Sequence, residues 1–147
     1  MSACIYKAEL DSLYHELERI KDALNDAYAE KNAAYGRVKR AKSDIESWYS
    51  RSRGTFFFWC NGGRKLPRHA LFGQSFGDLK GYKEDRGNAV CDIRYWSNRI
   101  SSLKASRAEV GKKIGHVKAA RQMMFDRKRE EYLLRKQKNR PSAGCRP

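Results

Sequence analysis

Apolar side chains recur at alternating steps of three and four residues over two long stretches of this sequence. The first series, here called the first seam, is Leu10, Leu13, Leu17, Ile20, Leu24, Ala27, Lys31, Ala34, Val38, Ala41, Ile45 and Trp48. The second seam is Leu79, Tyr82, Arg86, Ala89, Ile93, Trp96, Ile100, Leu103, Arg107, Val110, Ile114, Val117, Arg121 and Met124. A repeat of 3.5 residues buries one side of a long helix against a partner helix. The spacing therefore predicts two long helices that bury these seams.

The segment between the two seams is long enough to reverse the chain and too short for another domain. We expect helices over about residues 3–50 and 78–138, separated by an insert over 51–77. The predicted fold is all-α, a long antiparallel coiled-coil hairpin that forms one domain over 1–140. Because Pro141 is the first clear helix stop after the second seam, residues 141–147 are predicted to be a disordered tail.

The insert at the tip of this hairpin is basic and aromatic. Residues 55–60 are aromatic and strand-like, and Asn61 and Gly62 follow them as a strong signal for a two-residue hairpin turn. If residues 64–66 return as a second strand, the tip is a short β-hairpin, which Pro67 limits in length. Ser75 and Asp78 form a capping box that favours a helix start close to the second seam.

Basic residues are the only charged members of the two seams. Lys31, Arg86, Arg107 and Arg121 all occupy the first position of their heptads. We expect their long stems to extend out of the seam so that the charges reach water. The alternative is that the arginines face an acidic partner or phosphate. With Trp48 opposite Leu79, an antiparallel register would also place Lys31 beside Trp96.

The formal net charge of +15 and a pI near 9.9 favour anionic partners. Residues 1–30 carry seven acidic and three basic side chains, a balance of 3 − 7 = −4. The remainder therefore holds 15 + 4 = +19. This asymmetry predicts that anion binding avoids the start of the chain. Nucleic acid is the leading candidate partner, with the choice between DNA and RNA left open.

The expected phosphate-binding residues lie in the insert and along the second helix. Those in the insert are Arg51, Arg53, Arg64, Lys65 and Arg68, and those in the second helix are Lys112, Lys113, Lys118, Arg127, Lys128, Arg135 and Lys136. An antiparallel hairpin brings the second set near the acidic start of the first helix, so we expect some interhelical ion pairs. Residues 135–140 should extend beyond the first helix and stay available for phosphate.

A second series of residues comes directly after members of the first seam in the sequence. It contains a tyrosine stripe, Tyr14, Tyr28, Tyr35 and Tyr49, together with Lys21 and Lys42. Tyrosines at this position widen the apolar face, which favours a third helix or a second copy of the hairpin. Stacking of nucleic-acid bases is the alternative. We expect a protein partner or homodimer contact at Tyr14, Tyr28, Tyr35, Phe56, Phe58 and Phe72, although some aromatic residues of the insert should form a small core.

The sequence indicates no cofactor and no metal site, and its one candidate for catalysis is Cys60, which has arginines nearby. An enzyme is the least favoured interpretation. The three histidines are far apart, and the cysteines at 4, 60, 91 and 145 contain no CxxC pair. The longest apolar run is too short to span a bilayer, so no membrane partner is predicted and a reduced cytoplasmic protein is expected. Two hypotheses follow: a non-enzymatic nucleic-acid-binding protein with weak sequence specificity, or an adaptor, assembly factor or inhibitor that docks on another protein.

Overall fold

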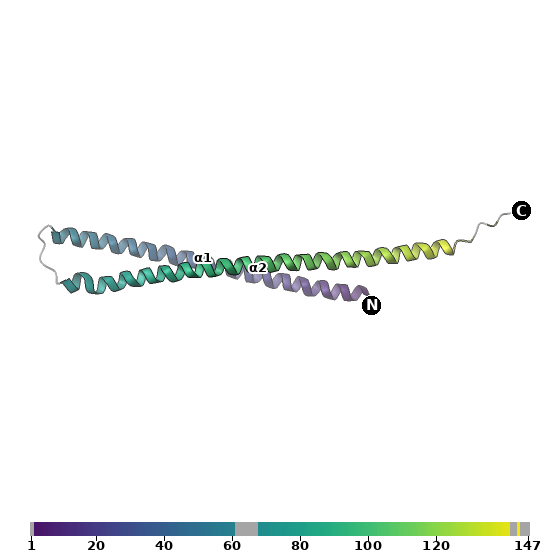
Figure 1. The fold of residues 1–147 in the computed structure, drawn as a ribbon, viewed down its shortest axis with the longest axis horizontal. Helices are drawn as coiled ribbons and strands as arrows, with labels where there is room; N and C mark the ends of the chain where they lie inside the picture. The colour runs from purple at the N-terminus through teal and green to yellow at the C-terminus, as the bar shows by residue number, and fades with distance from the viewer. Residues whose placement is uncertain (1, 61–67, 142–143, 145–147) are drawn as a thin grey trace. The chain divides into compact units, whose positions relative to one another are not determined.

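The protein consists of two long α-helices in the computed structural model, which describes residues 2–60, 68–141 and 144. Side chains are described for residues 4–51, 77–141 and 144. Helix α1 spans Ser2–Cys60 and α2 spans Arg68–Lys138 (Figure 1). No strand occurs in these described ranges, and the predicted all-α class is confirmed.

The helices are longer at the insert than the sequence indicated. Helix α1 continues through Cys60, so the strand expected over 55–60 is wrong, and the proposed turn and second strand lie outside the described residues. Extending a formed helix adds one hydrogen bond for each residue fixed, whereas an isolated two-stranded hairpin is marginally stable. Helix α2 begins at Arg68, upstream of the expected start near Ser75.

Contacts divide the chain into two compact units. Unit 1 contains residues 1–22 and 105–147, and unit 2 contains residues 23–104. Each helix contributes one segment to each unit. The single domain expected over 1–140 stays a prediction.

Unit 1 is held together by aliphatic side chains of the two seams. Leu10 of α1 and Val110 and Ile114 of α2 are buried in one cluster. The half-buried residues packed against this cluster are Leu13, Leu17, Ile20 and Val117. Burial of a Leu, Ile or Val side chain contributes about 1.5–3 kcal/mol relative to exposure.

Unit 2 has smaller side chains at its helix contact. Ala27, Ala34 and Ala41 of α1 are almost completely buried, together with Leu24 and Ile45. The buried hydrophobic residues of α2 in this unit are Leu79, Ala89, Ile100 and Leu103. The buried residues of unit 1 are Leu10, Val110 and Ile114. Every buried hydrophobic side chain in the described ranges of both units is therefore a member of a predicted seam.

The two helix segments in unit 2 run antiparallel. Tyr28 contacts Lys104, whereas Arg37, farther along α1, contacts Asp92, which lies earlier in α2. The guanidinium Nη2 of Arg37 donates to Asp92 Oδ2 over 2.9 Å. These two contacts agree with the antiparallel pairing that the heptad spacing predicts.

The basic members of the seams reach solvent as expected. Arg86, Arg107 and Arg121 are exposed, and Lys31 is half-buried. The ammonium of Lys31 lies 5.9 Å from the ring centre of Tyr35, one turn along α1. The predicted position of Lys31 beside Trp96 stays a prediction. Long stems thus cover apolar surface while the charges stay solvated.

Candidate nucleic-acid interface

The seven residues predicted for phosphate binding between positions 112 and 136 of α2 all lie in unit 1 and are exposed. The Lys113 ammonium is 3.7 Å from Glu109 on the same helix, and Lys118 lies over the ring of Tyr14. Arg127, Lys128, Arg135 and Lys136 form no ion pair with any other described residue. These four charges are therefore available to an external anion.

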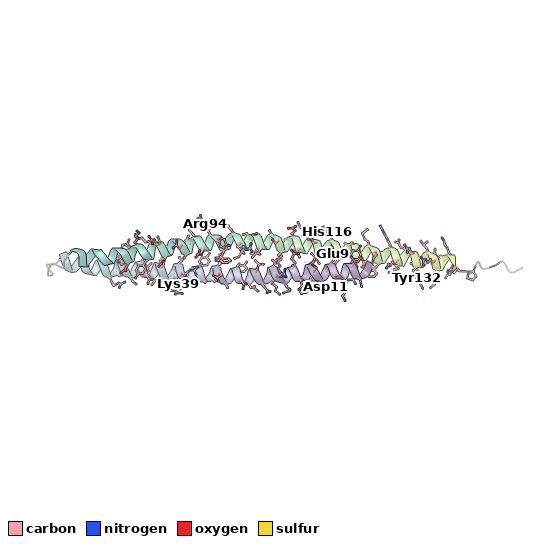
Figure 2. The ribbon with its side chains drawn as sticks, turned by 90° about the horizontal axis from the view of Figure 1, so that it is seen from below. Glu9, Asp11, Lys39, Arg94, His116 and Tyr132 are labelled. Atoms are coloured by element: carbon pink, nitrogen blue, oxygen red, sulfur yellow. The ribbon has the colours of Figure 1, made fainter. Side chains whose placement is uncertain are left out.

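The last part of α2 has no partner helix in unit 1. Every residue from Phe125 to Pro141 is exposed. In Figure 2, Tyr132 lies on α2 beyond the N-terminal end of α1, where Glu9 and Asp11 lie. At 1.5 Å per residue, the helical part beyond Phe125 is about 20 Å long. It carries the densest group of unpaired basic residues in unit 1.

Basic and aromatic side chains share one side of this part of α2, and the acidic side chains lie outside that side. A helix turns about 100° per residue, which places eight residues within an arc of about 120°. These residues, here called the basic–aromatic face, are Lys118, Arg121, Phe125, Lys128, Arg129, Tyr132, Arg135 and Lys136. The acidic residues nearby, Asp126, Glu130 and Glu131, fall outside the arc. One side of the helix therefore combines six positive charges with two aromatic rings.

The spacing also separates residues that the sequence analysis had grouped together. Lys112, Lys113 and Arg127 project from other sides of α2, outside the basic–aromatic face. Phe125, Arg129 and Tyr132 belong to this face, although none of them was predicted from the sequence as a binding residue. The seven-residue interval between Phe125 and Tyr132 was the signal that could have identified them, because such residues share one side of a helix.

A groove between α1 and α2 in unit 1 adjoins the basic–aromatic face. It has a volume of about 750 Å³ and is lined by Lys7, Leu10, Asp11, Tyr14, Lys118, Arg121, Gln122 and Phe125. The Arg121 guanidinium lies 5.5 Å from the ring centre of Phe125, and Lys118 lies 5.7 Å from that of Tyr14. Cations thus lie over aromatic rings from both helices along this groove.

The ion pairs expected between the acidic start of α1 and basic α2 are absent from the described part of unit 1. Its two ion pairs, Lys21–Glu18 and Lys113–Glu109, each lie within one helix. Asp11 lines the groove between the helices but forms no ion pair with a described residue of α2, and Lys113 pairs with Glu109 on its own helix. Residues 105–147 carry 13 basic and 4 acidic side chains, a formal charge of 13 − 4 = +9. Residues 1–22 carry 3 basic and 5 acidic side chains, a formal charge of 3 − 5 = −2.

Lysines of both helices lie beside the rings of three tyrosines of the stripe. Tyr14 and Tyr28 are each 41% exposed, and each ring lies under a lysine of α2, Lys118 in unit 1 and Lys104 in unit 2. These cation–π contacts cover part of each ring, and the predicted packing against a third helix or a second copy stays a prediction. Tyr35 is 52% exposed beside Lys31. A partner-binding role for Tyr14, Tyr28 and Tyr35 stays a prediction.

Most candidate residues of the insert lie outside the described side chains. These are Arg53, Arg64, Lys65, Arg68, Phe56, Phe58 and Phe72. Arg51 is described and exposed, and its Nε donates to the carbonyl oxygen of Ser47 over 3.4 Å. The predicted role of the insert in binding stays a prediction.

The described residues contain no group of three or more histidine, cysteine or acidic side chains that could hold a metal ion. Within the same ranges, neither helix has a stretch that is both long and apolar enough to cross a bilayer. Comparison of the chain with protein-family models, with curated proteins and with solved structures finds no match.

Proposed function

We propose that this protein binds nucleic acid through the basic–aromatic face of α2 and has no catalytic role. The observation that carries the proposal is the exposed end of α2. Lys128, Arg129, Arg135 and Lys136 lie there on one side of a helix, without acidic neighbours on that side and without ion-pair partners among the described residues.

Phosphate is the anion that this arrangement suits best. A row of basic side chains at helical spacing can contact successive phosphates of a nucleic-acid backbone, and each contact releases condensed counterions. Such contacts position the backbone but do not read base sequence. We therefore expect affinity that falls steeply with salt and depends weakly on sequence.

The test compares two variants that carry the same net charge. The face variant is Lys128→Gln, Arg129→Gln, Arg135→Gln and Lys136→Gln. The control variant is Lys39→Gln, Arg40→Gln, Arg94→Gln and Arg99→Gln, which removes four exposed charges from unit 2. Both variants have a formal net charge of 15 − 4 = +11. Any difference between them therefore reports the position of the charges.

Binding is measured by fluorescence anisotropy with labelled DNA and RNA over a range of salt concentrations. The slope of log K against log salt is about 0.7 for each contacted phosphate of a single strand and about 0.9 for a duplex. For a single strand, the slope measured with the face variant should be smaller than the wild-type slope by up to about 3, because four contacts are removed. The slope measured with the control variant should stay close to that of the wild type. Equal losses in both variants would contradict a site on α2.

A protein partner is the second candidate, and the exposed Leu133 and Leu134 favour it. Their side chains are 49% and 57% exposed on the end of α2 that has no partner helix in unit 1. They project outside the basic–aromatic face. A chain that fails to bind any nucleic acid at low salt would favour this candidate over the first.

A further inference from the structure

We propose that the nucleic acid recognised by α2 is single-stranded, with unpaired bases stacked on Phe125 and Tyr132. This inference rests on the proposed function and adds the class of ligand. The two rings are 42% and 65% exposed, respectively, although both are large aromatic side chains. No described side chain of α1 covers Tyr132, because α2 extends past the start of α1 there (Figure 2).

The spacing of the two rings suits one strand lying along the helix. Phe125 and Tyr132 are seven residues apart, which is about 10.5 Å of helix rise, and their directions differ by about 20°. Lys128 and Arg129 lie between them, one turn from each ring on the same side. Rings and cations therefore alternate along α2, as in surfaces that stack bases and hold the intervening phosphates.

The groove of unit 1 extends this pattern toward α1. Phe125 borders the groove, and Tyr14 of α1 contributes a third exposed ring on the opposite wall. Arg121 over Phe125 and Lys118 over Tyr14 bring a cation to each ring. An arginine plane also stacks on bases, so a strand that enters the groove meets aromatic and cationic surfaces together.

A duplex would use only part of this surface. Its bases are stacked on one another, so the rings of Phe125 and Tyr132 cannot stack on them unless the duplex opens. The cations would still contact its phosphates. The rings therefore predict a preference for single strands, while the charges alone predict binding to both forms.

The experiment uses the full chain and one sequence in two forms: an unstructured strand of about 15 nucleotides and the same strand annealed to its complement. The test variant is Phe125→Leu with Tyr132→Leu, which removes both rings but keeps apolar side chains that favour helix. The control is Tyr95→Leu, at a tyrosine of unit 2 that is 61% exposed. Circular dichroism establishes that all variants remain helical.

The wild-type chain should bind the strand more tightly than the duplex. The test variant should raise the Kd for the strand about tenfold or more, with little change for the duplex or in the salt slope. Equal weakening for both forms, or unchanged binding of the strand, would overturn the stacking proposal while leaving phosphate binding intact. Absence of binding to either form at low salt would instead refute the proposed function.

Discussion

Replacing Ala34 by leucine tests the helix contact in unit 2. The Ala34 side chain is completely buried in the first seam, where α1 lies against α2. A leucine adds three carbon atoms at a position that has no exposed surface. Overpacking of this kind costs about 1–3 kcal/mol, since side chains or backbone must shift to make room.

Ala33 provides the matched control, because it is the preceding residue of α1 and is exposed. The same change to leucine there alters helix propensity very little, as Ala and Leu are both strong helix formers. The difference between the two variants therefore isolates the effect of burial. We expect Ala34→Leu to be less stable than Ala33→Leu by about 1–3 kcal/mol.

Urea unfolding followed by circular dichroism measures this difference. In thermal unfolding, a loss of 1 kcal/mol lowers Tm by about 2–4 °C for a chain of roughly this size, so the expected shift is about 2–12 °C. Equal midpoints for the two variants would refute the assignment of Ala34 to the buried seam. A larger loss for Ala33→Leu would indicate that the side of α1 that carries Ala33 is buried instead.

Three further predictions concern both units. A double-mutant cycle on Arg37 and Asp92, monitored by urea unfolding, should give a coupling of about 0.2–1 kcal/mol, since the pair is exposed. Gly111→Ala and Gly115→Ala should each raise unfolding stability by about 0.5–1 kcal/mol, because open space surrounds the added Cβ within a helix; a loss would reveal a hidden contact. Ending the chain after Phe125 should change the unfolding midpoint little but weaken nucleic-acid binding strongly, and preserved binding would locate the site elsewhere.

The heptad spacing predicted the buried residues of the structure well. Alanines such as Ala27 and Ala34 are buried because they occupy seam positions, and that information is present in sequence spacing alone. The open spaces around Gly111 and Gly115 show that a small residue on a helix need not mark a close helix contact.

Interactions between the helices were harder to predict. The tyrosines next to the first seam suggested a further partner, but Lys104 and Lys118 of α2 lie over two of their rings. Recognising these pairs requires the register of two helices, which one sequence does not supply. The strand expected over 55–60 was wrong because the local aromatic pattern favoured a strand, whereas helix α1 continues through Cys60.

Protection of lysines from chemical acetylation tests the proposed binding surface most directly. The intact chain is acetylated at low salt with and without a single-stranded oligonucleotide, and each lysine is quantified by mass spectrometry. Lys118, Lys128 and Lys136 should be protected, while Lys39 and Lys80, exposed in unit 2, should react equally in both conditions. Protection confined to Lys65 would place the site in the insert, and unchanged reactivity of all lysines would contradict nucleic-acid binding by α2.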